Sequence, residues 1–278
     1  MIDIYNDYKL ALKIILPNFK QRKFGMKKIG IIGCGWLGFR MAKYYVPTNE
    51  IFATTTSDDK VKMLSDLGFE TFKIDFDADE FRKPNEIWKN LDVIIITIPF
   101  SKSADFEVLI KRFENISSFL KDFEKPIFLM SSIGIYPHIE QEITENNLDE
   151  NLLNSNIFGI ENLMKKNFPQ INILRLGGLM GDDRYLSKYK IKEPQQIVNH
   201  IHFEDISRIV EKMINENLQS KTYNLVAPLH PTKQQVVDFQ TKNIVTKLEE
   251  SFGRKIISTN LENVLKYKFL HPDPRKFK

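Results

Sequence analysis

A glycine-rich turn between a short apolar run and an amphipathic segment is the feature that most constrains the fold. Residues 28–33 read K-I-G-I-I-G, and the chain continues as C-G-W-L-G into a helical pattern over residues 36–46. In this strand–turn–helix context Gly33 allows a tight turn, Gly35 lets the backbone approach a pyrophosphate, and Gly38 lets the helix pack against the strand. The helix N-terminus offers free N–H groups to an anion. The pattern predicts a dinucleotide-binding turn, with a purely structural turn as the alternative.

Strand and helix patterns alternate over residues 26–176. Short apolar runs predict strands at residues 28–33, 51–54, 70–74, 93–98, 126–130 and 171–176. Apolar residues at helical spacing predict helices at residues 36–46, 58–67, 103–121 and 156–166. Such alternation is typical of an α/β protein with an open, doubly wound parallel sheet of the Rossmann type.

The chain divides into three predicted parts. Residues 26–176 form the NAD(P)-binding Rossmann domain. Residues 177–278 form a small C-terminal α/β lobe that packs on the same sheet and binds substrate, with helices at residues 204–215 and 233–248 and a strand at residues 222–226. Residues 1–25 form an extension or follow from a start codon assigned too early. A signal peptide fits poorly, because acidic residues come first and Lys13 interrupts the apolar run.

Composition excludes several classes of protein. With 42% hydrophobic and 27% charged residues, the chain can bury a core. The net charge of +4 is small and spread along the chain, which argues against a nucleic-acid partner. Apolar runs fall far short of the roughly 20 residues of a membrane helix. We expect a small-molecule substrate as partner, and the sequence predicts no oligomeric state.

Cys34 is the single cysteine and lies inside the glycine turn. One cysteine excludes an internal disulfide and fits a reducing compartment, so we expect a cytoplasmic protein. A thiol near a helix N-terminus can be reactive. The alternative is that Cys34 is a small spacer.

The second predicted strand ends in T-T-T-S at residues 54–57, where a carboxylate that binds the ribose of NAD is expected. The nearest acids are Asp58 and Asp59, and Ser57 followed by two acids is also a good helix start, because the hydroxyl can cap free N–H groups. Without a carboxylate at the strand end, the hydroxyls and Lys60 favour NADP slightly over NAD.

Asp75 and a histidine pair are further candidates. Asp75 ends the third strand at the edge of the sheet where ligands of such folds bind, and its carboxylate can accept a hydrogen bond from an adenine amino group. The alternative is an ordinary loop aspartate. His200 and His202 alternate in H-I-H, but two histidines without a cysteine partner are weak evidence for a metal, and Asp205 is expected to start a helix. We predict no metal site.

The sequence L-M-S-S-I-G-I-Y-P at residues 129–137, together with the glycine turn, resembles the extended short-chain dehydrogenase/reductase superfamily. The resemblance is to the NAD-dependent epimerase/dehydratase type, in its atypical branch, and covers most of residues 26–278. It extends to the segments at residues 54–57, 98–101, 174–181 and 199–205. It implies cofactor contacts at Gly33, Gly35, Trp36, Leu37, Gly38, Thr54, Thr55, Thr56, Ser57, Asp75, Ile98, Pro99 and Ser101.

The resemblance also implies catalytic positions. Ser132 matches the active-site Ser/Thr that hydrogen-bonds the substrate oxygen gaining or losing a hydride, and Ser131 and Tyr136 match neighbouring family positions. Tyr136 is the second catalytic candidate. The branch commonly carries T-T-R after the second strand, so Thr56 stands where an arginine would hold a 2′-phosphate, which weakens the case for NADP.

The catalytic Tyr-x-x-x-Lys pair of the family is absent. Anchoring the helix on Glu161 puts Leu153 and Ile157 at the tyrosine and lysine positions, and neither side chain can transfer a proton. Other residues could take over the proton transfer: Tyr136 with the nearby His138, or one of three residues in the loop that follows Gly181. Each of them can instead be a packing or surface residue. The three are Tyr185, Lys188 and Tyr189.

Two functions therefore compete. The first is an NAD(P)-dependent oxidoreductase, epimerase or dehydratase that acts on a carbonyl or hydroxyl group, with Ser132 polarising the oxygen. The second is a non-catalytic dinucleotide-binding sensor or scaffold, which the missing pair favours.

Overall fold

The computed structural model describes residues 26–80, 86–100, 105–244 and 250–277. The predicted extension over residues 1–25 and the predicted cofactor residue Ser101 lie outside these ranges. Among the helices in the described ranges, none has the length and apolar character needed to cross a membrane.

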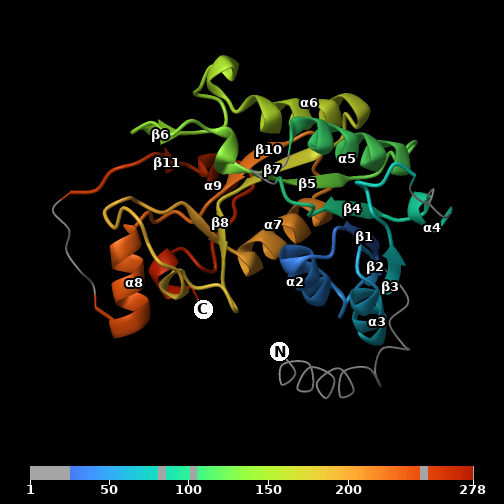
Figure 1. Cartoon of the computed structure of the whole chain (residues 1–278), viewed down its shortest axis with the longest axis horizontal. Coiled ribbons are helices and arrows are strands. Elements are labelled where there is room, and N and C mark those ends of the chain that lie inside the picture. Colours follow the sequence, from blue (N-terminus) through green and yellow to red (C-terminus); the bar gives the residue numbers. More distant parts are fainter. Residues whose placement is uncertain (1–25, 81–85, 101–104, 245–249, 278) are drawn as a thin grey trace.

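A seven-stranded sheet in the order β10-β7-β5-β4-β1-β2-β3 forms the centre of the molecule (Figure 1). Every neighbouring pair in it is parallel. Its strands are β1 (Lys28–Ile32), β2 (Glu50–Thr55), β3 (Glu70–Lys73), β4 (Val93–Ile96), β5 (Ile127–Ser132), β7 (Asn172–Leu176) and β10 (Thr222–Leu225). The predicted Rossmann-type sheet is therefore confirmed.

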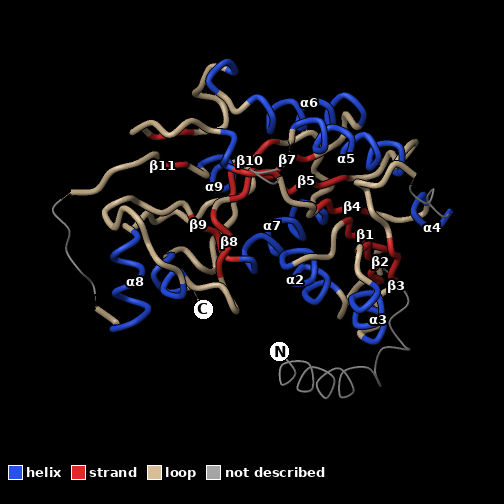
Figure 2. Tube along the Cα trace, viewed as in Figure 1, coloured by secondary structure: helices blue, strands red, loops and turns tan. Residues whose placement is uncertain are grey.

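Helices cover both faces of the sheet (Figure 2). One layer contains α2 (Trp36–Tyr45), α3 (Asp58–Asp66) and α7 (Phe203–Asn215). The other contains α4 (Glu86–Lys89), α5 (Phe106–Phe119) and α6 (Ser155–Asn167).

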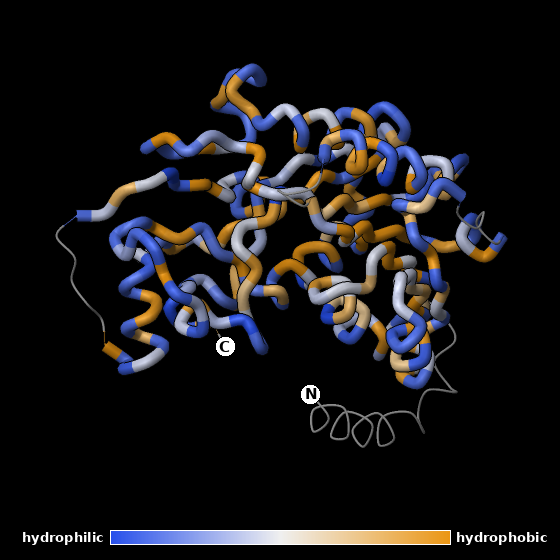
Figure 3. The backbone as a smooth tube through the Cα atoms, viewed as in Figure 1, coloured by the Kyte–Doolittle hydropathy of each residue, from blue (hydrophilic) through white to orange (hydrophobic). Residues whose placement is uncertain are grey.

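Strand β4 shows why the central strands are apolar throughout. Val93 and Ile95 pack into the core on the α2 side, whereas Ile94 and Ile96 pack into the core on the α5 side. A strand covered on both faces has no solvated side for polar residues. The central strands are accordingly among the most hydrophobic segments in Figure 3.

Several predicted boundaries are wrong, and three of the elements show why. Strand β4 ends at Ile96 instead of residue 98, so the next three residues form a loop at the edge of the sheet. Strand β5 continues to Ser132, which lies inside the strand and not after it. Helix α8 (Lys233–Lys242) stops before the predicted residue 248, because Asn243 adopts a left-handed conformation with φ 55° that ends the helix.

The chain after residue 176 contributes to the sheet and also builds a separate region beside it (Figure 1). Strand β10 is an edge strand of the sheet, and α7 packs against α2. Besides α4, sequence patterns missed one element before residue 176 and several after it, because runs of two to five residues show no periodicity. They are β6 (Glu142–Ile143), β8 (Gly178–Met180), β9 (His200–His202), β11 (Lys255–Ile256) and α9 (Thr259–Asn263).

A buried ion pair ties α6 to the sheet. Arg175 of β7 donates to both oxygens of Glu161, with an Nη2–Oε2 distance of 2.7 Å, and the two side chains are 5% and 0% exposed. Burial disfavours the charge of Arg175, but the hydrogen bonds and charge of Glu161 outweigh it and raise the pKa of Arg175. Ser131 Oγ donates to Glu161 Oε1 at 2.6 Å, and Arg175 Nη1 donates to the Tyr136 hydroxyl at 2.9 Å.

We predict that Glu161→Ala lowers the free energy of unfolding by about 3–5 kcal/mol, because it leaves the Arg175 guanidinium buried without a counter-ion. Urea unfolding followed by circular dichroism measures the loss. Glu86→Ala, which removes an exposed pair with Lys89, should leave the urea midpoint unchanged. A loss at residue 161 no larger than that of the control would contradict the importance of the buried pair.

Candidate functional site

Hydrogen bonds fix the glycine turn to two neighbouring strands. Gly33 has φ +87°, a conformation that side chains rarely adopt. Its N–H donates to Thr54 Oγ1 at 2.9 Å, and its carbonyl accepts from Thr97 Oγ1 at 2.6 Å. Cys34 N–H donates to the Thr54 carbonyl at 2.8 Å. The turn is therefore attached to the carboxyl ends of both β2 and β4.

The other two glycines of the turn serve different purposes. A Cβ atom on Gly38 would lie 2.8 Å from the Gly33 carbonyl oxygen and 2.5 Å from Thr97 Oγ1, so Gly38 is required for packing. A Cβ atom on Gly35 would meet only the Gly33 oxygen, at 3.9 Å, so the space beside Gly35 is open. Gly35 is the N-cap of α2, and the first turn of that helix carries no acidic residue. The helix N-terminus therefore opens on space that an anion can enter.

A cavity of about 410 Å³ lies at this edge of the sheet. Its lining includes most of the predicted cofactor residues, namely Gly33, Gly35, Trp36, Leu37, Thr54, Thr55, Thr56, Asp75, Ile98 and Pro99. Gly38 and Ser57 do not line it, and Ser101 lies outside the described residues.

The cavity also contains residues that the sequence did not single out as cofactor contacts. Thr97 comes directly after β4, where its position at a strand end is a usable signal. Arg112 lines the cavity from α5, and Leu179 and Arg184 reach it from the chain after β7. Leu179 lies just after β7, within the segment 174–181 that carries the resemblance. Arg112 and Arg184 do not directly follow a strand of the central sheet, so no local pattern identifies them.

At the β2 end of the cavity a basic side chain lines the wall and the nearest acidic one does not. Asp58 does not line the cavity and pairs with Lys73 at 2.5 Å, whereas Lys60 does line it. The first turn of α3 carries Asp58 and Asp59 as predicted, but Ser57 makes no side-chain hydrogen bond to the helix. The predicted capping by the Ser57 hydroxyl is therefore wrong.

Two aspartates line the β3 end of the cavity. Asp75 Oδ1 accepts from the N–H of Asp77 at 2.9 Å. Asp77 accepts two bonds from Arg112, at 2.6 and 2.7 Å, and these bonds lower the pKa of Asp77. The second oxygen of Asp75 has no hydrogen-bond partner among the described residues, which leaves it as an acceptor on the cavity wall.

Cys34 lies in the cavity wall but is only 4% exposed. Burial raises the pKa of its thiol to about 12, although the charge of Lys60 acts in the opposite direction. The thiolate is the reactive form of cysteine, so this environment favours the spacer over the reactive thiol.

The predicted catalytic residues lie outside this cavity. Ser132 ends β5, the neighbour of β4, and its Oγ accepts from the N–H of Gly134 at 3.0 Å. Tyr136 is 3% exposed; its hydroxyl donates to Asn224 Oδ1 at 2.7 Å and accepts from Arg175. Burial raises the pKa of Tyr136, although Arg175 and Asn224 oppose the rise. Both hydrogen-bonding directions of the Tyr136 hydroxyl are therefore used within the protein.

A second cavity, of about 480 Å³, contains the two residues that the resemblance aligns with the family's tyrosine and lysine. Leu153 and Ile157 line it together with Tyr136 and the exposed His138. The remaining candidates lie elsewhere. Tyr185 lines a third cavity near the end of the chain; Lys188 bonds the backbone of Asp183, and Tyr189 is 53% exposed.

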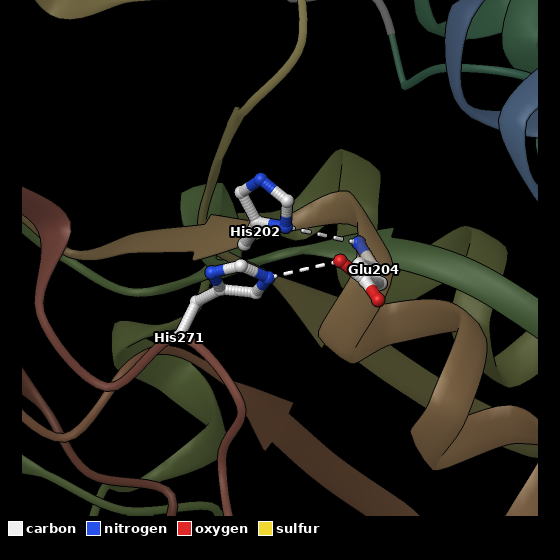
Figure 4. Close-up of side chains that lie close together, drawn as sticks. All are labelled: His202, Glu204 and His271. Atoms are coloured by element: carbon white, nitrogen blue, oxygen red, sulfur yellow. Dashed lines mark hydrogen bonds and ion pairs between the residues drawn. The ribbon is translucent and has the colours of Figure 1, made fainter. Parts of the chain in front are cut away.

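His202, Glu204 and His271 gather at the start of α7, with potential ligand atoms within 4.8 Å of one another (Figure 4). His202 Nδ1 accepts from the N–H of Glu204 at 3.3 Å, and His271 Nε2 lies 3.0 Å from Glu204 Oε2. The lone pair of His202 Nδ1 is thus directed at a backbone N–H at the positive end of a helix dipole, an unfavourable place for a cation. His202 therefore serves as the N-cap of α7.

Asp205 was expected to start this helix, but the capping side chain is that of His202. Asp205 is fully buried in the first turn instead, where it accepts from the Tyr267 hydroxyl and from the N–H groups of Leu270 and His271. It therefore attaches the C-terminal segment to α7.

Comparisons with known proteins agree on the fold. No family model matches the chain. A putative NAD-dependent epimerase/dehydratase from Methylobacillus flagellatus superposes with a TM-score of 0.66 at 16% identity, covering 90% of this chain and 95% of that one. UDP-glucuronic acid 4-epimerase from Bacillus cereus, solved in complex with NAD, gives 0.68 at 14% identity, covering 90% and 97%. A functionally unknown conserved protein from Silicibacter pomeroyi gives 0.69 at 15%, covering 90% and 96%.

The chain therefore has the Rossmann-type fold of these proteins, which is the fold that the resemblance of its motifs implies. Among curated proteins it is similar to Protein YeeZ of Escherichia coli K12, with 23% identity over 269 residues, which covers 90% of this chain and 98% of that protein.

We predict that Cys34 does not react with a disulfide reagent such as DTNB while the protein is folded. With a pKa of about 12, only roughly one thiol in ten thousand is ionised at pH 8. Absorbance at 412 nm measures the released thiolate, and unfolding in guanidinium should release one equivalent per chain. Rapid stoichiometric release from the folded protein would contradict the buried placement of Cys34.

Proposed function

We propose that the protein binds NAD(P) in the cavity beside the glycine turn and acts as an oxidoreductase or epimerase on a carbonyl or hydroxyl group of a small molecule. The observation that carries the proposal is the 410 Å³ cavity, which contains the glycine turn, the residues that follow β2 and the residues that follow β4. In doubly wound sheets ligands bind outside the carboxyl ends of the strands, where this cavity lies.

The residues of the cavity fit a dinucleotide. The open space beside Gly35 accepts a pyrophosphate, and the N-terminal N–H groups of α2 supply donors without a competing carboxylate in the first turn. At the far end, the unpaired oxygen of Asp75 can accept from an adenine amino group, beside Ile74 and Phe76. The dinucleotide would therefore extend from the start of α2 toward the end of β3.

The charge distribution supports NADP(H) over NAD(H). The ribose next to the adenine would lie at the end of β2, where the lining residues are Thr55, Thr56 and Lys60. A carboxylate there would bind two ribose hydroxyls and repel a 2′-phosphate. Asp58 is instead paired with Lys73 away from the cavity. Hydroxyls and an ammonium group complement a phosphate, even though Thr56 replaces the arginine of the T-T-R pattern.

Ser132 is our candidate for orienting the substrate. Its oxygen accepts from the N–H of Gly134, so its O–H hydrogen remains available to a substrate oxygen. A bound nicotinamide would supply hydride transfer. We assign Tyr136 a positioning role, because its hydroxyl bonds Asn224 and Arg175. The single cysteine supports a reducing compartment, and we place the activity in the cytoplasm.

The second cavity favours an alternative function. Leu153 and Ile157 line the place of the family's proton-transferring pair, and neither can donate or accept a proton. A protein that keeps the dinucleotide cavity without this pair can serve as a non-catalytic sensor or scaffold. A screen of aldehydes and ketones with NADPH separates the two: turnover that falls at least tenfold in Ser132→Ala supports the enzyme, and binding without turnover supports the sensor.

We predict that wild-type protein enhances nicotinamide fluorescence when titrated with NADPH, and that Gly35→Asp abolishes the enhancement. The aspartate places a negative charge where the pyrophosphate binds, whereas the fold has room for the side chain. Ser65→Asp adds the same charge on an exposed part of α3 and should bind normally. Binding of neither NADPH nor NADH by folded wild-type protein, or unchanged affinity in Gly35→Asp, would overturn the assignment.

We predict further that Lys60→Ala weakens NADPH binding about five- to tenfold and changes NADH binding less than about twofold, because the side chain would contact only the 2′-phosphate. The same fluorescence titration measures both affinities. Equal losses for the two nucleotides would show that Lys60 does not select the 2′-phosphate.

A further inference from the structure

A tight turn after β8 lies against the start of α2. Gly181 and Arg184 exchange two backbone hydrogen bonds, each of 3.0 Å, and Gly181 and Asp182 both have positive φ angles, 106° and 56°. The two reciprocal bonds and these backbone angles define a single compact conformation. The side chains of its four residues therefore start from a fixed backbone beside α2.

Side chains of this turn form hydrogen bonds and ion pairs with α2 next to the glycine turn. Trp36 Nε1 donates to Asp183 Oδ1 at 2.6 Å. Arg40, one helical turn later, pairs with Asp182 at 2.6 Å and with Asp183 at 2.7 Å. Arg40 Nη1 also donates to the Trp36 carbonyl at 3.0 Å. These contacts hold the indole ring of Trp36, the first residue of α2, in place.

Two guanidinium groups lie against that indole ring, but they differ in their partners. The Cζ atoms of Arg40 and Arg184 are 4.0 and 4.1 Å from the Trp36 ring centroid. Arg40 is neutralised by the two aspartates. The guanidinium of Arg184 makes no hydrogen bond or ion pair with any described residue, although its charge helps to lower the pKa of the neighbouring Asp183. Arg184, unlike Arg40, lines the cavity of the glycine turn.

We propose that Arg184 is an anion-binding residue of this cavity, which contacts the pyrophosphate of the bound dinucleotide together with the N-terminus of α2. The inference rests on the proposed function and adds to it a cofactor-binding residue from outside the glycine turn. The Trp36 ring is the platform that positions the guanidinium, and Asp183 fixes the ring through its Nε1 hydrogen bond.

The chemistry of the two groups supports this pairing. A planar guanidinium binds phosphate oxygens through two parallel hydrogen bonds, and stacking on an aromatic face restricts its rotation before the ligand arrives. An arginine that is already ordered loses less conformational entropy on binding. The guanidinium of Arg184 and the helix N-terminus both carry positive charge, so together they favour an anion in the cavity and disfavour a cation.

The test compares two probes in wild-type protein and in Arg184→Gln. NADPH carries the pyrophosphate, whereas adenosine 2′-monophosphate carries the adenine end without it. We expect Arg184→Gln to weaken NADPH binding about 10- to 100-fold, the range for a lost charge-assisted pair, and to change displacement by adenosine 2′-monophosphate less than about twofold. Arg184→Lys keeps the charge but not the planar fork and should give a smaller loss for NADPH.

Arg208→Gln is the matched control, because it removes one positive charge from an exposed position on α7 that does not line the cavity. It should leave both affinities unchanged. If wild-type protein binds NADPH and both Arg184 variants bind it equally well, the inference fails while the proposed function stands. If wild-type protein binds neither NADPH nor NADH, the proposed function fails and the inference fails with it.

A double-mutant cycle tests the role of the ring. If Trp36 positions Arg184, the loss of NADPH affinity caused by Arg184→Gln should be at least about threefold smaller in a Trp36→Leu background than in the wild type. Fully additive losses would show that Arg184 acts without its platform and would overturn that part of the inference.

Discussion

The hydrogen bonds that join Gly33 to Thr54 and Thr97 are the contacts on which the rest of the site depends. They attach the turn after β1 to the ends of β2 and β4, and they require the left-handed backbone that Gly33 adopts. With the turn fixed, α2 starts at the edge of the sheet and directs its N-terminus into the cavity. The packing of Gly38 against the same turn keeps the helix close to the strand.

The buried pair of Arg175 and Glu161 determines which hydroxyl groups near the end of β5 remain available to a ligand. The pair engages the two residues, Ser131 and Tyr136, that flank the candidate catalytic serine. A tyrosine bonded to a guanidinium and to Asn224 is ordered but has no free hydrogen bond for a substrate. Of Ser131, Ser132 and Tyr136, only Ser132 has an O–H without a hydrogen-bond acceptor among the described residues, and for this reason we propose Ser132, and no proton-transfer residue, for contact with a substrate oxygen.

Local signals were enough to predict the sheet and the glycine turn, because each depends on residues adjacent in sequence. The alternation of apolar runs predicts β1 to β5, and the spacing of Gly33, Gly35 and Gly38 predicts the turn. Tertiary contacts decided the rest. The hydrogen bond between Trp36 and Asp183 joins positions far apart in the chain. The capping role of His202 depends on where α7 begins. No periodicity encodes such contacts.

The central claim is that a dinucleotide binds at the glycine turn, and a crystal structure of the protein with NADPH tests it most directly. The account predicts pyrophosphate oxygens within hydrogen-bond distance of the first backbone N–H groups of α2, in the space beside Gly35, with the adenine toward Asp75. A dinucleotide ordered elsewhere on the protein, or an empty cavity in crystals grown at saturating NADPH, would contradict it.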